Sequence, residues 1–126
     1  MYNPNNKKYR FNEIVAIDAG YSESAMFCNI YFWVCKNEGK KDHFHEGVYW
    51  MYCTVREFTE KYPFWSEAQI KRILKNLEKK GYIRTGRFNK YGPDRTKWYT
   101  ITEKGLTAVA NNSSDSVETI HSISEF

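Results

Sequence analysis

The 126-residue sequence predicts a mainly helical α+β domain in which a short β-sheet follows the helices, and three observations support this class. The segment Ser66–Lys80 has apolar residues at intervals of three and four, as an amphipathic helix does. Gly81 ends this helix, and two strand-forming segments follow at 82–88 and 98–102. Only a short turn separates the helix Ser66–Lys80 from a preceding capped helix. This order of elements is the layout of a winged helix-turn-helix with a three-stranded sheet.

The N-terminal half is expected to supply two further helices. Residues 12–19 (NEIVAIDA) predict a short helix that ends at Gly20. Ser22 is the predicted N-cap of a longer helix over residues 23–36, which is expected to be the buried central helix. Its apolar residues at helical spacing are Met26, Phe27, Ile30, Tyr31, Val34 and Cys35.

A loop and the first strand come next, and the helix-turn-helix follows them. Residues 37–46 are hydrophilic and predict the loop, and residues 48–53 (VYWMYC) have high strand propensity. Two capping boxes mark the following helices, Thr54 with Glu57 and Ser66 with Gln69. The inward stripe of the second capped helix consists of Ile70, Ile73, Leu74 and Leu77.

The chain is expected to divide into three parts. Residues 1–11 are polar and predict a flexible arm, and residues 12–105 form the winged domain. Residues 106–126 hold five serines and neither Lys nor Arg, which predicts an acidic tail or linker. Residues 103–110 are expected to add one or two helical turns.

Composition excludes several classes of protein. A hydrophobic fraction of 41% with 17% aromatic residues supports a packed core. No apolar run of about 18 residues predicts a membrane span, and the first ten residues lack the apolar stretch of a secretory signal. Three cysteines without framework spacing indicate reduced thiols, so the expected location is the cytoplasm.

Charge is distributed unevenly along the chain. Residues 1–65 hold eight basic and eight acidic residues, whereas residues 66–105 hold 11 Lys/Arg against 4 Asp/Glu, a net of +7. Residues 106–126 carry a net of −3. Because the positive charge falls on the helix and hairpin of the predicted winged fold, the sequence predicts a surface that binds double-stranded DNA.

The helix Ser66–Lys80 is the predicted recognition helix. On a helical wheel, Ala68, Arg72, Lys75 and Lys79 point away from the apolar stripe. Gln69 and Asn76 flank them on one side, and Lys71 flanks them on the other. Ser66 and the free N–H groups of the first turn are suited to bind a phosphate. The predicted DNA-binding residues of this helix are Ser66, Ala68, Gln69, Arg72, Lys75, Asn76 and Lys79.

Different roles are expected along this helix. Gln69 and Arg72 lie toward its N-terminus and are the candidates for base edges, since glutamine can pair with adenine and arginine with guanine. Ala68 permits close approach or contact with a thymine methyl group. Lys75 and Lys79 are expected to contact phosphates.

The hairpin loop is the predicted wing. Basic and aromatic residues alternate in it, and its tip is placed to contact the DNA backbone or the minor groove. Phe88 and Trp98 are expected to pack against the domain, whereas Tyr91 beside Gly92 is expected to be exposed. The predicted DNA-binding residues of the wing are Arg87, Lys90, Tyr91, Arg95 and Lys97.

Catalytic and metal sites find little support in the sequence. His43 and His45 with Cys35 or Cys53 lack the paired spacing of a zinc site. No base is marked beside a cysteine, and neither a nucleophile elbow nor a phosphate-binding glycine loop is present. The expectation is therefore a protein that is not an enzyme and has no cofactor.

A family resemblance adds to this reading. The segment YWMYCTVREFTEKYPFWSEAQIKRILKNLEKKGYIRTGRFNKYGPDRTKWYTIT resembles the winged-helix domain of replication initiator and replisome-organiser proteins from Gram-positive phages and related mobile elements. It is similar, more distantly, to DnaD-type primosomal proteins. The resemblance rests on PFWS at 63–66, the run at 70–83 and DRTKWYTIT at 94–102, and it extends over residues 12–105.

The resemblance implies a winged-helix fold, binding to origin or other duplex DNA, frequent oligomerisation, and neither cofactor nor catalysis. It places the recognition helix at Ser66–Lys80 and the wing at Arg87–Lys97. Such initiators usually continue into a second domain that recruits the helicase loader, whereas this chain has a short acidic tail there.

Two functional hypotheses remain open at this point. The first is a duplex DNA-binding protein of phage or mobile-element origin that acts in replication initiation or transcriptional regulation. The alternative is a protein-interaction module, such as a phage-encoded, anti-CRISPR-like inhibitor of host nucleoprotein machinery, which ten Tyr and four Trp favour. RNA binding is a third option. A homodimer through the helix at 23–36 is also expected.

Overall fold

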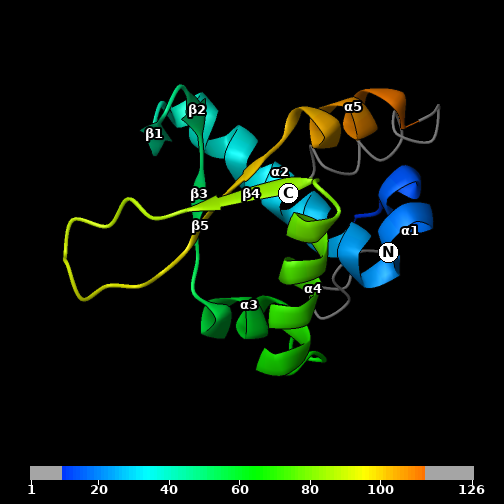
Figure 1. The fold of residues 1–126 in the computed structure, drawn as a ribbon, viewed down its shortest axis with the longest axis horizontal. Coiled ribbons are helices and arrows are strands. Elements are labelled where there is room, and N and C mark those ends of the chain that lie inside the picture. The colour runs from blue at the N-terminus through cyan, green and yellow to red at the C-terminus, as the bar shows by residue number, and fades with distance from the viewer. Residues whose placement is uncertain (1–9, 113–126) are drawn as a thin grey trace, which may run out of the picture.

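The computed structural model describes residues 10–112 (Figure 1). The helices in this part are α1 (Glu13–Ala19), α2 (Tyr21–Lys40), α3 (Val55–Lys61), α4 (Glu67–Lys79) and α5 (Glu103–Asn111). The strands are β1 (Phe44–His45), β2 (Val48–Tyr49), β3 (Met51–Tyr52), β4 (Ile83–Gly86) and β5 (Trp98–Ile101). Most of the predicted arm and tail, at 1–9 and 113–126, lies outside the described residues.

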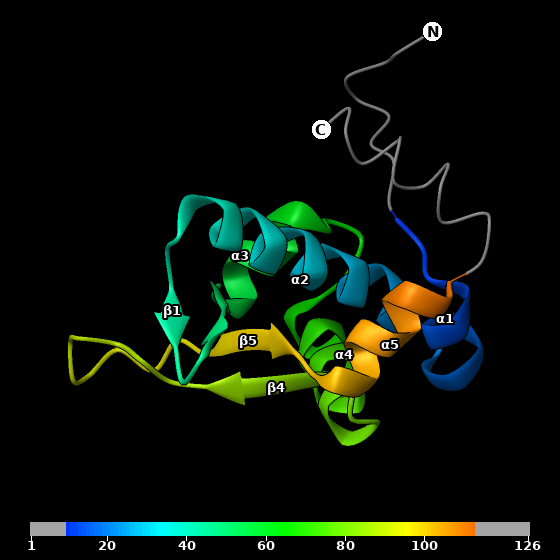
Figure 2. The same ribbon diagram turned by 90° about the horizontal axis from the view of Figure 1, so that it is seen from above.

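Strands β3, β5 and β4 form an antiparallel three-stranded sheet in that order. Met51 of β3 pairs with Tyr99, and Ile83 of β4 pairs with Ile101 on the other side of the central strand. The loop between β4 and β5, residues 87–97, projects away from the helices and is called the wing loop below (Figures 1 and 2). The mainly helical α+β class and its three-stranded sheet are confirmed.

One hydrophobic core joins the helices to the sheet. Helix α2 supplies Met26, Phe27 and Ile30, which are 0% exposed. The predicted inward stripe of α4 is buried, as the periodicity indicated. Other members of the core are Val15, Met51, Cys53, Phe58, Tyr62, Tyr82, Ile83, Tyr99, Ile101 and Ala108.

Helix α2 starts at a different residue from the one predicted. Its first residue is Tyr21, and Gly20 is the N-cap, without a side-chain capping bond. Gly20 has a φ of 121°, which glycine adopts without the steric cost of a Cβ. Glycine therefore makes the corner between α1 and α2, and the predicted N-cap at Ser22 is wrong.

The same helix also extends further than predicted, to Lys40 instead of residue 36. Asn37 is buried there, and its amide donates a hydrogen bond to the carbonyl oxygen of Trp50 at 2.8 Å. This bond joins residues 13 apart in the sequence. It stabilises a helical turn that the local composition alone assigns to a loop.

The predicted strand at 48–53 is divided. Strand β2 pairs with β1 in a small hairpin, whereas β3 joins the three-stranded sheet, and Trp50 lies between them. The Trp50 backbone N–H donates to the carbonyl of His43 (3.0 Å), and its indole Nε1 donates to the carbonyl of His45 (2.8 Å). These bonds turn the chain at Trp50, so part of the predicted loop at 37–46 is strand β1.

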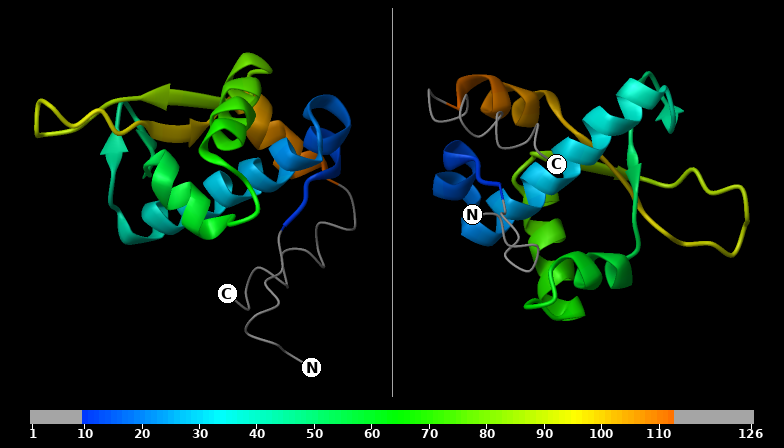
Figure 3. Two further views of the ribbon diagram at one scale, coloured as in Figure 1. Left: turned by 90° about the horizontal axis from the view of Figure 1, so that it is seen from below. Right: turned by 180° about the vertical axis from the view of Figure 1, so that it is seen from behind.

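Helices α1 and α5 lie side by side at the end of the molecule away from the wing loop (Figures 2 and 3). Asn12, the N-cap of α1, donates from Nδ2 to the carbonyl of Ala108 in α5 at 3.2 Å. Its backbone N–H and C=O both bond to the hydroxyl of Ser24, at 2.7 Å each. Helix α5 continues to Asn111, past residue 105 where the sequence interpretation ended the domain.

Gly105 at the start of α5 marks a close approach between elements. A Cβ there would lie 2.6 Å from the carbonyl oxygen of Tyr82 and 2.6 Å from Cγ2 of Ile101. We expect Gly105→Ala to lower the free energy of unfolding by about 1–3 kcal/mol, although alanine is normally the better helix former. Urea denaturation measures this change.

A matched control is Gly39→Ala in α2. A Cβ at Gly39 would meet no atom within 4 Å, so this substitution is expected to stabilise the protein by up to about 1 kcal/mol. If Gly105→Ala raises the free energy of unfolding as Gly39→Ala should, the close packing of α5 against Tyr82 is contradicted.

Candidate nucleic-acid interface

Helix α4 is oriented by its cap and by its buried face. The Ser66 hydroxyl accepts from the N–H of Gln69 (3.1 Å), and Gln69 Oε1 accepts from the N–H of Ser66 (2.8 Å). This reciprocal pair is the predicted capping box, which the structure confirms. With the apolar stripe packed inward, the exposed residues of the helix are Glu67, Ala68, Lys71, Arg72, Lys75, Glu78 and Lys79.

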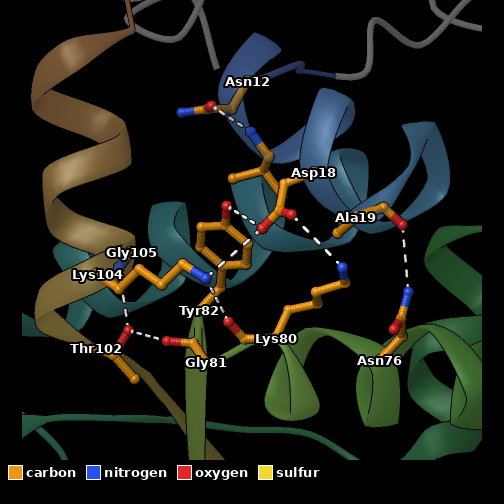
Figure 4. Close-up of polar contacts among 11 residues, drawn as sticks. Asn12, Asp18, Ala19, Asn76, Lys80, Gly81, Tyr82, Thr102, Lys104 and Gly105 are labelled. Atoms are coloured by element: carbon orange, nitrogen blue, oxygen red, sulfur yellow. Dashed lines mark hydrogen bonds and ion pairs between the residues drawn. The ribbon is translucent and has the colours of Figure 1, made fainter.

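Three of the predicted DNA-binding residues of α4 already have partners within the chain. Gln69 uses its carbonyl oxygen in the cap, so in a bidentate contact with adenine that oxygen would be shared with the Ser66 N–H. Asn76 donates from Nδ2 to the carbonyl of Ala19 at 3.2 Å (Figure 4). It also donates to Glu23 Oε2 at 2.9 Å, and thereby ties α4 to α1 and α2. The Ser66 hydroxyl is likewise occupied by the cap.

The basic residues of the wing loop face outward. Arg87, Lys90, Arg95 and Lys97 are exposed, and Tyr91 near the tip is 70% exposed. In Figure 2, α4 lies near one end of strands β4 and β5, the wing loop extends from their other end, and α2 lies on the upper side of the picture. Strand β4 directly follows α4 and leads into the wing loop, so the predicted residues of these two elements lie on neighbouring parts of the chain.

The base of the wing loop is packed by aromatic rings. The Phe88 ring stacks on His45 at a centroid distance of 4.4 Å and lies 4.8 Å from the Trp50 ring. Trp98 is 7% exposed, and its ring contacts His43 and His45 of the β1 segment. The expectation that Phe88 and Trp98 pack against the domain is confirmed, and the β1–β2 hairpin supplies part of that packing.

A hydrogen-bond network inside the wing loop was not foreseen from the sequence. Asn89 Nδ2 donates to the carbonyls of Asp94 (3.0 Å) and Thr96 (2.8 Å). Asp94 accepts from Thr96 and from the Tyr52 hydroxyl of β3, and these bonds hold the pKa of its carboxyl below the usual range. The signal available in the sequence was the Gly92-Pro93-Asp94 turn, in which aspartate commonly bonds the backbone two residues later.

The positive charge of α4 and the wing loop is not neutralised within the described chain. Among residues 10–112, eight cations of α4 and the wing loop make no ion pair with a carboxylate: Lys71, Arg72, Lys75, Lys79, Arg87, Lys90, Arg95 and Lys97. By contrast, Arg84 at the base of the wing pairs with Glu46 (3.4 Å). The arrangement leaves eight exposed positive groups available to polyanions.

The C-terminal end of α4 is fixed by a polar junction around Asp18 (Figure 4). The Tyr82 hydroxyl donates to Asp18 Oδ2 at 2.7 Å, and the ammonium groups of Lys80 and Lys104 lie 3.5 and 3.6 Å from the carboxylate. The Tyr82 bond, with the two lysines, holds the pKa of Asp18 below its usual range. This junction orients α4 from α1 and α5, on the side away from the wing loop.

Metal-ligating groups, thiols and apolar helices bear on other kinds of site. Between residues 10 and 112 no three His, Cys, Asp or Glu side chains are grouped to hold a metal ion. Burial raises the pKa of the Cys28 and Cys53 thiols to about 12, so neither is a ready thiolate. No helix in this part of the chain is long and apolar enough to cross a bilayer.

Comparison with known proteins gives a family match. The model described as "Transcriptional regulator PadR-like family" matches residues 44–111, which is more than half of the chain. The matched segment runs from β1 to α5 and includes both α4 and the wing loop. No curated protein and no solved structure matches the chain.

Proposed function

Because the chain belongs to the PadR-like family of transcriptional regulators, we propose that it controls transcription by binding duplex DNA with helix α4 and the wing loop. Regulators of this family are DNA-binding winged-helix proteins and not enzymes. The observation that carries the assignment of the surface is the set of eight exposed cations without an ion pair. Uncompensated charge of this kind attracts a phosphate backbone and releases its counterions.

The exposed residues of α4 support a division of roles. Arg72 lies in the N-terminal half of the helix with an unpaired guanidinium, which fits bidentate pairing with guanine. Ala68 lies one turn before it and suits contact with a thymine methyl group. Lys75 and Lys79 follow on the same exposed face and are proposed to bind phosphates. The capped Gln69 is proposed to donate only from its amide nitrogen.

Transcriptional control is preferred over replication initiation and over host inhibition. The family match supports a winged-helix regulator, and it supports neither the DnaD-like initiator resemblance nor the anti-CRISPR-like alternative nor a phage origin. Part of the aromatic surplus that favoured a docking module is used for packing inside the domain. The buried aromatic residues are Phe27, Trp50, Phe58, Tyr62, Tyr82, Trp98 and Tyr99.

Two copies are proposed to bind one operator. Dimeric winged-helix and helix-turn-helix proteins read half-sites about one helical turn apart, so the operator is expected to be an inverted repeat. The predicted dimer contact through residues 23–36 has little apolar surface for a second copy at Met26, Phe27 and Ile30, because these side chains are buried inside the chain. Sedimentation at tens of micromolar, compared with the 15.0 kDa of one chain, tests the pairing.

A salt series tests the proposed function. Binding to a fluorescent random-sequence duplex should weaken with a slope of log K against log[salt] of about −4 to −7, if half to all of the eight cations each neutralise a phosphate. A single strand of the same length should bind more weakly. Equal or tighter binding to the single strand, or no duplex binding at low salt, would contradict the assignment of duplex DNA binding. After a positive result, selection from random sequences would identify the operator.

A further inference from the structure

The wing loop contains more internal hydrogen bonds than an exposed hairpin tip needs. We propose that Asn89 and Asp94 are positioning residues, which hold the wing loop in its DNA-binding shape before DNA is present. This inference rests on the proposed function, because it assigns the residues that prepare the same surface. Neither residue is among those predicted to touch DNA.

Asn89 joins the two sides of the loop. Its Nδ2 donates to the carbonyls of Asp94 (3.0 Å) and Thr96 (2.8 Å) on the returning side. Its Oδ1 accepts from the indole Nε1 of Trp98 at 2.7 Å. Since Trp98 is 7% exposed and packs against Tyr52 and Phe88, this one amide connects the loop to the packed base of the wing.

Asp94 organises the tip. Its Oδ1 accepts from the backbone N–H of Thr96 (3.0 Å) and from the Thr96 hydroxyl (2.7 Å). Its Oδ2 accepts from the Tyr52 hydroxyl of β3 at 3.1 Å, and its backbone N–H closes a turn on the carbonyl of Tyr91 at 3.0 Å. These bonds attach the loop to strand β3 and also join residues within the loop.

These bonds decide which side chains face outward. Asp94, Thr96 and Trp98 are at least partly buried, whereas the intervening Arg95 and Lys97 are exposed. Since Asp94 and Thr96 bond inward, the residues between and after them, Arg95 and Lys97, are left facing solvent. The network thus orients the positive groups of Arg95 and Lys97, although neither Asn89 nor Asp94 is positively charged.

The energetic consequence is a smaller ordering cost on binding. A flexible loop must lose backbone freedom when it settles on DNA, and a loop that is already ordered does not. Ordering a single residue corresponds to about a 5- to 30-fold change in an equilibrium constant. Releasing the loop should therefore weaken DNA binding by about this factor.

A matched pair of substitutions separates positioning from charge. Asp94→Ala and Asp94→Asn both remove one negative charge from a cationic loop, which by electrostatics alone should tighten binding to a random-sequence duplex. The asparagine amide oxygen can still accept from Thr96, whereas alanine cannot. We expect Asp94→Asn to bind at least as tightly as wild type, and Asp94→Ala to bind about 5- to 30-fold more weakly, with the same salt slope as Asp94→Asn.

Backbone order is measured separately on the free protein. Amide ¹⁵N order parameters for residues 90–95 should be about 0.85 in wild type and should fall below about 0.6 in Asp94→Ala and in Asn89→Ala. Thermal unfolding of each variant shows whether the rest of the domain remains intact. This matters most for Asn89→Ala, because that change leaves the Trp98 indole without its partner.

The outcomes are distinguishable. Equal binding by Asp94→Ala and Asp94→Asn overturns the inference, and so do order parameters below about 0.6 for the wild-type loop. The proposed function still holds in these cases if the wild-type protein binds the duplex. If wild type does not bind the duplex, the proposed function fails. In that case the order parameters alone decide whether Asn89 and Asp94 hold the wing loop.

Discussion

Phe27→Ala is expected to lower the free energy of unfolding by about 3–5 kcal/mol, the range for truncating a fully buried phenylalanine. The Phe27 side chain is 0% exposed, and its ring meets the Tyr82 ring edge-on at a centroid distance of 5.8 Å. It also lies against the start of α5 near Gly105. Because domains of this size are stable by about 5–15 kcal/mol, the loss is a large part of the total.

The measurement is urea denaturation followed by tryptophan fluorescence, with Ile17→Ala as the control. Ile17 is 81% exposed on α1, so its truncation should change the free energy of unfolding by less than about 0.5 kcal/mol. A cost below about 1 kcal/mol for Phe27→Ala would mean that α2 does not complete the core.

The importance of Phe27 also bears on where the domain begins. The family match starts at residue 44, but the fully buried side chains of Val15, Met26, Phe27 and Ile30 precede it. Helix α2 packs on both α4 and β5, so the element that carries the predicted DNA contacts rests on residues outside the matched segment. The folding unit is therefore longer than the segment by which the family is recognised.

The helix-turn-helix and the wing strands could be predicted because their signals are local. Capping boxes span three residues, and the apolar stripe of α4 repeats within one helix, so neither depends on distant contacts. The departures occur where long-range hydrogen bonds decide the backbone. Asn37 bonds Trp50 and extends α2, and Trp50 bonds His43 and His45 and divides the predicted strand.

The candidate site shows the same division. Exposure of Arg72, Lys75 and Lys79 follows from helical periodicity, so the sequence identified them as surface residues. The partners of Asn76 could not be found this way, because Ala19 and Glu23 are more than fifty residues away along the chain. The DNA contacts of Arg72, Lys75 and Lys79 stay predictions, which measurements of binding test.

Arg72→Ala is expected to weaken binding to the selected operator by about 1–3 kcal/mol, and to relax the sequence preference at one base pair. The guanidinium is exposed on the N-terminal half of α4 and makes no ion pair in the described chain, so nothing in the free protein compensates for its loss. Fluorescence titration with the operator and with a variant at each base pair measures both effects.

Lys79→Ala and Lys40→Ala separate base contact from charge in the same assay. Lys79 is exposed near the end of α4, so its loss should reduce the salt slope by about one and weaken all sequences equally. Lys40 is exposed at the end of α2 and belongs to neither α4 nor the wing loop, so Lys40→Ala removes the same charge with little expected effect. If Arg72→Ala weakens all sequences equally, as Lys79→Ala should, Arg72 contacts a phosphate and the base edges are read elsewhere on α4.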